Sequence, residues 1–273
     1  MANKKSRRRG RGPVFYLLFF LLLGIFCFSG WKVGSYLLGG AEQKKNFSEL
    51  SQLVEQNRMP QSETPSHSAD ETETAPPEET EPPILPEYAA ILDLNPDLVG
   101  WIRIPGTVID YPVMQTPDDP EYYLHHDFYH TVSEWGCIFA DAACDVVTPS
   151  DNVTLYGHHM QDGSMFAGLD GYGKQEFWED HQIVEFDSLT QYRRYRVFAV
   201  FKTSGYLGEG FPYHTFVEAD SPEDFQDFVS QCKTMSFYDT GITPEYGDKL
   251  ICLSTCEYTQ ANGRLVVVAV MDP

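Results

Sequence analysis

Short runs of β-branched and aromatic residues recur from about residue 98 to the end of the chain, and turn residues separate them. Runs of this length and composition are typical of strands. They predict eight strands, at Val99–Ile104, Val108–Met114, Trp135–Asp141, Asn152–Tyr156, Ile183–Phe186, Tyr192–Lys202, Lys249–Thr255 and Arg264–Met271. Eight short strands with turns between them favour a mainly β fold, a closed or nearly closed barrel.

The last two of these runs carry the clearest hairpin signal. Asn262-Gly263, a strong turn pair, stands just before the second run. A hairpin here would bring Cys256, at the end of one strand, close to Arg264, at the start of the other. A thiol beside a permanent cation can become a thiolate, so this pair could take part in a reaction as well as in packing. A lone Cys at a strand end is more often a small buried hydrophobe, so the rest of the chain must decide between the two interpretations.

Two short helices are predicted around the strands. Pro86–Leu94 has proline near its first position, and Pro96 stops it. The second helix lies in the long interruption of residues 203–248, between the sixth and seventh strands. It begins at Ser221 as the capping residue, with Pro222 and two acids in its first turn. Its apolar residues recur at helical spacing, which predicts a face packed on the barrel rather than a ligand site.

The N-terminal pattern is of a different kind. Residues 1–12 form a tail with six Lys or Arg and no acid, and the uncharged run that follows extends to Trp31. About 20 apolar residues suffice to cross a bilayer, so residues 13–31 predict a transmembrane signal anchor. The basic tail stays in the cytoplasm, which places the bulk of the chain outside a single-pass cell-membrane protein. A cleaved signal peptide is the alternative, but the run is long for one and no clear cleavage site follows it.

Residues 32–84 predict a juxtamembrane segment and an acidic, proline-rich linker. Ser48–Asn57 reads as a short helix with Ser48 as its cap. Gln61–Pro83 is rich in Pro, Glu, Thr and Ser, a composition that cannot bury a core, so we expect a disordered stalk. The folded domain is then expected to comprise residues 85–273.

Charge and cysteine content exclude several function classes. The chain has 40 acidic and 19 basic side chains, and only 13 of the basic ones lie beyond residue 12. Nucleic-acid binding is excluded on this balance, since phosphates require clustered cations. The six cysteines show no metal-ligand spacing, and the acids form no calcium-loop pattern, so we expect no metal and no cofactor. Cys137 and Cys144 are expected as free buried thiols, with a disulfide as the alternative.

A cysteine nucleophile needs a base, and histidine is the usual one. Of the eight histidines, His158 and His159 follow a predicted strand directly, after Gly157, where a loop can present a ring to a groove. Neighbouring residues at a strand end point in different directions, so only one of the two should face Cys256. A single histidine at such a place is more often structural, and the choice again needs the wider pattern.

The wider pattern resembles a known family, the sortases. The order Tyr156-Gly157-His158, then LSTC at Leu253–Cys256, then an arginine eight residues later is similar to the family's histidine, TLxTC and arginine signatures. Cys252 stands where threonine is common. Further stretches, DLVGWIRIPGTVIDYPVMQ, YYLHHDF and GSMFAGL, together with the helical insertion before the last two strands, resemble class B sortases specifically. The likeness extends over Pro86–Met271.

The resemblance implies an eight-stranded sortase barrel and a cysteine transpeptidase. It implies Cys256 as nucleophile, His158 as general acid and base, and Arg264 as the cation that stabilises the oxyanion or orients the substrate; His159 is the alternative base. Ser254 and Glu257 flank the nucleophile and are expected to line the substrate groove.

The partners that the resemblance implies are surface proteins with a C-terminal sorting signal of the Asn-Pro-x-Thr or Pro-Pro-x-Thr type, and a peptidoglycan-precursor amine as acceptor. A pilin lysine is the alternative acceptor. Two other interpretations stay open: a cysteine hydrolase that uses the same residues, and a non-enzymatic β-domain in which Cys256 is buried and inert.

Overall fold

The computed structural model describes residues 12–58, 82–206 and 208–272. The chain divides into two compact units, Met1–Gln43 and Lys44–Pro273. The predicted basic tail lies outside the described residues except for Gly12, and so does most of the predicted stalk. Within the first unit, the described residues form the N-terminal part of helix α1 (Pro13–Asn57). By length and composition this apolar, solvent-exposed stretch is able to cross a membrane.

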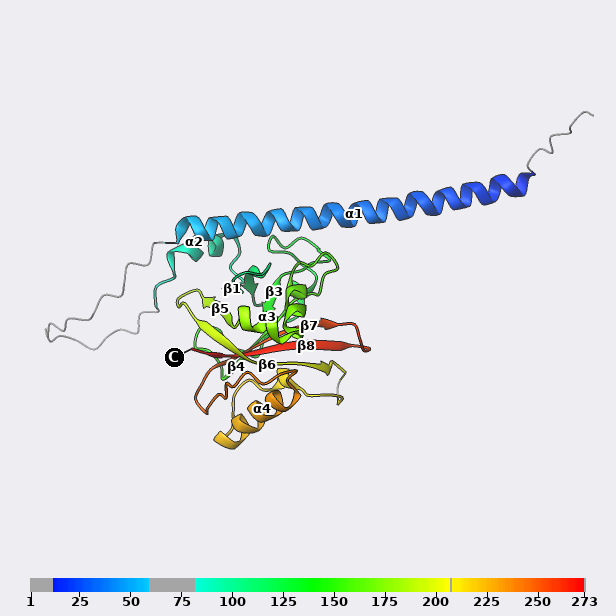
Figure 1. Ribbon diagram of the computed structural model, residues 1–273. Coiled ribbons are helices and arrows are strands. Elements are labelled where there is room, and N and C mark those ends of the chain that lie inside the picture. Colours follow the sequence, from blue (N-terminus) through cyan, green and yellow to red (C-terminus); the bar gives the residue numbers. More distant parts are fainter. Residues whose placement is uncertain (1–11, 59–81, 207, 273) are drawn as a thin grey trace, which may run out of the picture. The chain divides into compact units, whose positions relative to one another are not determined.

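The second unit is built on a closed eight-stranded barrel, as the strand pattern predicts (Figure 1). The strands follow one another around it in the order β1-β2-β3-β4-β7-β8-β6-β5, and β5 pairs with β1 to close the ring. The pairs β2–β3 and β4–β7 are parallel, and the other six are antiparallel. The strands are β1 (Leu98–Arg103), β2 (Asp110–Met114), β3 (Ile138–Ala140), β4 (Asn152–Tyr156), β5 (Ile183–Ser188), β6 (Arg194–Ser204), β7 (Leu250–Glu257) and β8 (Gly263–Met271).

All eight predicted strands are present, with bounds that differ by up to three residues. The largest difference is at β3, which begins at Ile138 rather than Trp135. Gly136 has φ of 58°, outside the extended region, and a side chain there would collide with the carbonyl oxygen of Tyr123. The backbone therefore turns at Gly136 to pass the neighbouring segment, and regular pairing begins two residues later.

Helices and short 3-10 turns connect the strands. Helix α2 (Pro86–Leu94) has the predicted bounds. Helix α4 (Pro222–Met235) begins after Ser221, whose side chain accepts a hydrogen bond from the Asp224 N–H, as the capping pattern predicts. Helix α3 is Gln175–Asp180, and the 3-10 turns are η1 (Tyr122–Leu124), η2 (Phe166–Gly173) and η3 (Tyr213–Thr215).

The apolar face of α4 is part of a core, as its spacing predicts. Phe225, Phe228, Val229 and Cys232 are buried in one cluster with residues of β6, β7 and β8. Figure 1 shows α4, in orange, beside this side of the barrel. The insertion of residues 205–249 is thereby fixed to strands β6–β8, two of which carry the predicted nucleophile and arginine.

The predicted separate helix at Ser48–Asn57 is wrong in one respect. Helix α1 is continuous through this region, so Ser48 is not a cap. Phe47, Leu50 and Val54 are buried on one face of it, and the Phe47 ring packs edge-on against Tyr111 with centroids 5.2 Å apart. Residues 44–57 thus belong to the second unit, which extends N-terminal of Leu85, where the sequence placed its start.

An ionic cluster fastens the end of this helix to the barrel. The Arg58 guanidinium lies 3.4 Å from a Glu87 carboxylate oxygen and 3.3 Å from an Asp187 oxygen. The Tyr88 hydroxyl donates to the same Asp187 oxygen at 2.6 Å, and Tyr192 donates to Glu87. Both carboxylates are buried, so a cation and two phenol donors offset the cost of removing them from water.

Candidate active site

Strands β7 and β8 bring the predicted thiol and cation together. In the antiparallel register Cys256 stands directly opposite Arg264, and Glu257 opposite Gly263. The turn uses Asn262 with φ of 51°, a conformation that asparagine tolerates better than most residues. The hairpin that the sequence predicts is therefore confirmed, and Cys256 is half-buried rather than enclosed.

Gly157 sets the position of the predicted histidine. Strand β4 runs parallel to β7 with Tyr156 opposite Ser254, and the Gly157 N–H donates to the Ser254 carbonyl at 3.1 Å. The Thr255 hydroxyl donates back to the Gly157 carbonyl at 2.8 Å. These two bonds hold the residue before His158 against the segment that ends in Cys256. The end of β4 and the end of β7 therefore present their side chains at the same edge of the barrel.

The His158 ring is held by one backbone carbonyl. Its Nε2 lies 2.8 Å from the Leu124 carbonyl oxygen, on turn η1. A carbonyl only accepts hydrogen bonds, so Nε2 carries the proton and donates it. In the neutral ring Nδ1 is then the nitrogen that can take up or release a proton. Turn η1 therefore fixes both the orientation and the tautomer of this ring.

Arg264 lies within a tight backbone environment. Its guanidinium donates to the Gly263 carbonyl at 3.0 Å, and the side chain is half-buried. Gly205, just after β6, approaches so closely that a side chain there would lie 3.1 Å from the guanidinium carbon. Contact of this kind restricts the guanidinium to a small region beside Cys256. A guanidinium held in this way offers donors to a developing oxyanion.

One cavity of about 400 Å³ contains all three predicted catalytic residues. Cys256, His158 and Arg264 line it, together with Ser254. Its other walls come from the end of β3, the end of β4 and the segment before η1. A thiol, an imidazole and a guanidinium that share one cavity are the groups that acyl transfer through a thioester requires.

The two residues predicted to bind substrate differ in their placement. Ser254 lines the cavity, and its Oγ lies 2.6 Å from the Tyr213 hydroxyl oxygen. Glu257 is not among the lining residues. Its Oε1 pairs with Lys202 Nζ at 2.7 Å and accepts the Thr259 N–H at 2.7 Å. Burial alone would raise the pKa of Glu257, but these two partners outweigh it and lower the pKa.

His159, the alternative base, has a different partner. Its Nε2 lies 2.7 Å from an Asp170 carboxylate oxygen, and its ring packs edge-on against Tyr258 with centroids 5.3 Å apart. It does not line the cavity that contains Cys256. The structure thus separates the two adjacent histidines, as expected for neighbours at a strand end.

The other cysteines of the barrel unit are free and enclosed. Burial raises the pKa of Cys144 to about 11, and it raises the pKa values of Cys137, Cys232 and Cys252 further above the ordinary value. These thiols stay protonated and behave as small apolar side chains. Cys137 and Cys144 are both free, in agreement with the favoured alternative from sequence.

Sequence reasoning did not single out several residues of the cavity. Leu124 was visible only as part of the YYLHHDF stretch, and its backbone carbonyl, which no side-chain pattern encodes, is the group that holds His158. Glu121 and Asp141 also line the cavity. They reach it from two connections far from Cys256 in sequence, so only the closed barrel brings them there.

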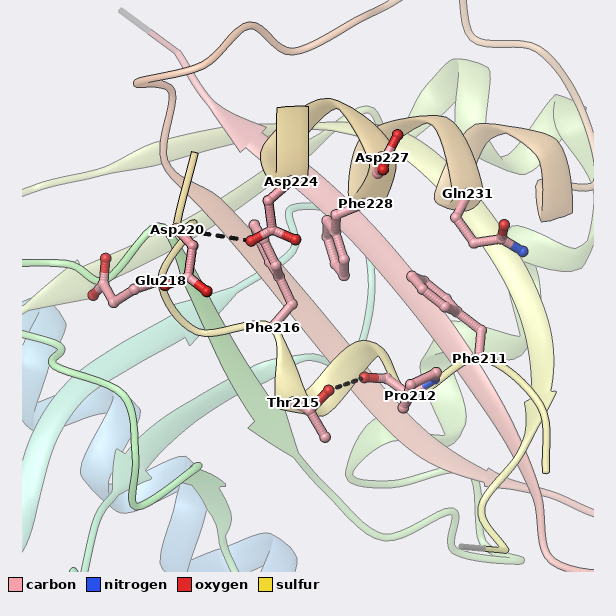
Figure 2. Close-up of a pocket in the computed structure, with 10 residues that line it drawn as sticks. All are labelled: Phe211, Pro212, Thr215, Phe216, Glu218, Asp220, Asp224, Asp227, Phe228 and Gln231. Atoms are coloured by element: carbon pink, nitrogen blue, oxygen red, sulfur yellow. Dashed lines mark hydrogen bonds between the residues drawn. The ribbon is translucent and has the colours of Figure 1, made fainter. Parts of the chain in front are cut away.

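A second cavity, of about 470 Å³, lies between α4 and the segment around η3. Figure 2 shows the rings of Phe211, Phe216 and Phe228 on its apolar side, with the carboxylates of Asp220 and Asp224 near its rim. The Phe216 and Phe228 rings stack with centroids 4.1 Å apart. Among its described lining residues there is no Cys or His, so the predicted catalytic residues lie in the first cavity and not in this one. Across the described ranges, no group of three or more His, Cys, Asp or Glu is arranged to hold a metal ion.

Comparison with known proteins identifies the family of this chain. A family model for the sortase domain matches residues 102–272. Sortase B of Listeria monocytogenes is 34% identical over 252 residues, which cover 90% of this chain and 92% of that protein. This chain belongs to the sortase family. Sortase B of Staphylococcus aureus is 30% identical over 254 residues, 91% of this chain and 93% of that protein.

Solved structures agree with the assignment of this sortase to class B. A crystal structure of sortase B from B. anthracis, in complex with AAEK1, has a TM-score of 0.69 at 30% identity and covers 86% of this chain and 98% of that one. A Staphylococcus aureus sortase B–substrate complex has a TM-score of 0.70 at 28% identity, with the same coverage. The protein is a class B sortase, and its enzymatic class is cysteine transpeptidase.

Proposed function

We propose that this sortase cleaves a C-terminal sorting signal of the Asn-Pro-x-Thr or Pro-Pro-x-Thr type after its threonine and joins the protein to a cell-wall peptidoglycan amine. Cys256 is the nucleophile, His158 the general acid and base, and Arg264 the oxyanion or substrate-orienting cation. The observation that carries the proposal is the single cavity lined by these three side chains. Ser254 contributes to the substrate wall of the same cavity.

The first half of the reaction forms a thioester. The Cys256 thiolate attacks the carbonyl carbon of the Thr–X peptide bond, and the carbonyl π electrons move to its oxygen. Arg264, opposite Cys256 in the strand register, stabilises the resulting negative charge. The tetrahedral intermediate collapses with loss of the amine, which takes the Nδ1 proton of the His158 imidazolium, the partner of the thiolate at the start of the cycle. The products are the Cys256 thioester and the released C-terminal fragment.

The second half transfers the acyl group. The acceptor amine attacks the thioester carbonyl and gives its proton to Nδ1 of neutral His158, while Nε2 stays bonded to the Leu124 carbonyl. The second intermediate expels the Cys256 thiolate and leaves a new amide bond. Over both halves one proton leaves His158 and one returns, so the enzyme is regenerated without an external oxidant or reductant.

Two solved relatives support the choice of partners. One is the substrate complex of Staphylococcus aureus sortase B, and another is described as sortase B complexed with triglycine. A peptide that begins with glycine presents an unhindered amine, as a peptidoglycan acceptor would. We therefore extend to this chain both a sorting-signal protein as donor and a peptide amine as acceptor.

We also propose that residues 13–31 anchor the enzyme in the cell membrane, with the N-terminus in the cytoplasm and the barrel outside. The apolar, exposed N-terminal part of α1 supports the anchor, and the six basic residues before it support the orientation. Donor proteins held in the same membrane would then share a surface with the cavity.

Peptide turnover by the full chain in detergent tests this proposal. Quenched fluorogenic peptides of both types would be incubated with and without an added amine. Cleavage after Thr should disappear in Cys256→Ala and fall at least a hundredfold in His158→Ala and Arg264→Ala. His159→Gln is the matched control and should retain the wild-type rate, because its ring lies outside the cavity.

The products separate the proposed enzyme from its alternatives. An amide product with triglycine or a stem-peptide amine would support the cell-wall transferase, and an amide formed only with a pilin lysine would favour a polymerising sortase. Cleavage without any amide product would identify a hydrolase. If Cys256→Ala still cleaved the peptides, the assignment of the nucleophile would be refuted.

A further inference from the structure

The segment that follows His158 folds back onto it. The Phe166 N–H donates to the His158 carbonyl at 3.0 Å, and His159 and Met165 form an antiparallel bridge just inside this contact. Residues 158–166 therefore make a closed loop that begins with the proposed acid–base group. We call this segment the histidine loop.

Two peptide planes meet at the His158 Cα atom, and hydrogen bonds hold both of them. The plane before it carries the Gly157 carbonyl, which accepts the Thr255 hydroxyl at 2.8 Å. The plane after it carries the His158 carbonyl, which accepts the Phe166 N–H. Because peptide groups are planar, these two planes determine φ and ψ of His158 and hence the direction of its Cα–Cβ bond. The position of the ring therefore depends on where Phe166 lies.

Met165, the residue before Phe166, has an unusual backbone conformation. Its φ is 56° and its ψ is −135°, and a positive φ is rare for a residue with a side chain. Such a conformation persists only where the surroundings hold it. The Met165 N–H donates to the Tyr111 hydroxyl oxygen at 3.1 Å, and this bond is buried. Burial raises the pKa of Tyr111 to about 12, so a neutral phenol on β2 holds the end of the histidine loop.

The C-terminal part of helix α1, residues 44–57, holds Tyr111 in turn. The Phe47 ring packs edge-on against the Tyr111 ring with centroids 5.2 Å apart, and both side chains are buried. One helical turn further along, the Ser51 hydroxyl donates at 2.5 Å to the carboxylate of Asp110, the neighbour of Tyr111. The helix therefore contacts β2 at the residue that holds Met165 and at the residue next to it.

The same stretch of α1 also reaches the histidine loop directly. Lys44 Nζ lies 3.2 Å from one Asp162 carboxylate oxygen. The other Asp162 oxygen accepts the N–H and the hydroxyl of Ser164, at 3.1 and 2.6 Å. Burial alone would raise the pKa of Asp162, but Ser164 and Lys44 outweigh it and lower the pKa. A charged Asp162 thus orders the residues just before Met165, with a cation of α1 beside it.

We propose that Phe47 and Tyr111 are positioning residues for His158, and that the C-terminal part of α1 sets the geometry of the acid–base group through them. The inference rests on the proposed role of His158 and goes beyond it. It makes turnover depend on the helix that also carries the proposed membrane anchor. Neither Phe47 nor Tyr111 lines the cavity that contains Cys256. The expected effect of changing them is therefore on kcat, with little effect on KM.

Tyr111→Phe in the full chain in detergent tests the hydroxyl. The ring stays against Phe47, while the Met165 N–H loses its acceptor. We expect kcat for the fluorogenic peptides to fall about tenfold and KM to stay within about twofold, since a shift of about 1 Å in a catalytic group costs up to about a hundredfold. Tyr238→Phe is the matched control and should keep the wild-type kcat, because its hydroxyl donates to the Tyr172 carbonyl at 3.0 Å, outside the histidine loop.

Phe47→Leu tests the link to α1. It keeps an apolar side chain but removes the ring that packs on Tyr111, and kcat should fall roughly fourfold, less than in Tyr111→Phe because the hydroxyl remains. Val54→Ala is the matched control, since Val54 is buried on the same helix roughly 10 Å further along its axis. It should keep the wild-type kcat, and urea unfolding would verify that both variants are folded in the assay. Equal kcat in the two variants would refute the proposed role of α1.

Proton NMR of the full chain with isotope-labelled histidine reports the His158 ring without any substrate. The Nε2 proton is bonded to the Leu124 carbonyl, so it should exchange slowly enough with water to be observed. The resonance that disappears in His158→Gln identifies it. We expect it in the wild type and in Tyr238→Phe, and we expect it to be broadened or lost in Tyr111→Phe. Its absence from the wild type, or its unchanged presence in Tyr111→Phe, would overturn the proposal.

The two readouts separate this inference from the proposed function. If the wild type cleaved no peptide, the proposed function would fail, and the NMR resonance would decide whether Tyr111 holds the ring. If cleavage were normal and Tyr111→Phe kept both kcat and the resonance, the positioning role would be refuted and the transpeptidase would stand. A fall in kcat with an unchanged resonance, or a rise in KM alone, would refute action through His158.

Discussion

Gly157 offers a test of how the fold positions His158, the proposed acid–base group. A Cβ added at this position would lie 2.5 Å from the Ile138 Cδ1 atom and 2.8 Å from two atoms of the Phe166 ring. Real Cβ atoms do not come this close to other heavy atoms, so something must shift. Both neighbours are fully buried, so neither can swing into solvent. Gly157→Ala therefore overpacks a site with no spare volume.

We expect Gly157→Ala to lower both the stability of the fold and the rate of peptide turnover. Overpacking by one methyl group in a well-packed core costs about 1–3 kcal/mol, and we expect the Gly157→Ala free energy of unfolding to fall by about 2 kcal/mol. The backbone of residue 157 is hydrogen-bonded to Ser254 and Thr255, so any shift of this backbone moves His158 relative to Cys256. A displacement of about 1 Å in a catalytic group can reduce kcat roughly a hundredfold.

Urea unfolding and peptide turnover on the same preparation would measure both effects. Gly173→Ala is the matched control, because that glycine is exposed, has an ordinary φ and has no heavy atom within 4 Å of an added Cβ. It should stay within about 0.5 kcal/mol of wild type or gain slightly. If Gly157→Ala unfolded at the wild-type urea concentration and kept full kcat, the steric argument would be refuted.

Three further predictions concern single contacts. Tyr213→Phe removes the partner of the buried Ser254 hydroxyl, 2.6 Å away, and should cost about 1–2 kcal/mol in urea unfolding; an unchanged midpoint would contradict this. Within the barrel unit, iodoacetamide at neutral pH should modify Cys256 before any other cysteine, as peptide mass spectrometry would show, because the remaining four are buried. Burial tends to raise the pKa of Asp151, but Lys249 at 2.8 Å and a backbone N–H outweigh it, so the folded-state pKa lies below the ordinary 3.8. This contribution to stability is present above about pH 4 and is lost as the pH falls through the folded-state pKa; Lys249→Met should flatten urea-unfolding free energies over that range, and an unchanged slope would count against the pairing.

Much of the fold was predictable because its signals are local. Eight apolar runs of strand length, the cap at Ser221 and the proline at Pro86 each act within a few residues, and the corresponding elements form where they were expected. Cys256 and Arg264 are only eight residues apart around the turn signal Asn262-Gly263, so a hairpin that brings them together was expected from the local pattern, and the register places them opposite each other.

Local patterns did not reveal the contacts that depend on partners distant in the sequence. Ser48 looked like a helix start, yet α1 is continuous there, since its buried face packs on Tyr111 of the barrel rather than ending at a cap. Glu257 was expected in the substrate groove because it follows Cys256, but Lys202 on β6 and the N–H of Thr259 engage its carboxylate. In both cases the deciding contact comes from a part of the structure that no local pattern reveals.

The sequence by itself determined the strands of the barrel and their order along the chain, because these follow from local periodicity. Its resemblance to a family named the thiol, ring and guanidinium that the proposed mechanism uses. The tertiary structure alone decided what surrounds them. Closure of the ring brings the Leu124 carbonyl to His158 and the carboxylates of Glu121 and Asp141 into the cavity that Cys256 lines. These contacts join segments far apart in the chain, and their geometry depends on strand pairing and packing across the whole barrel.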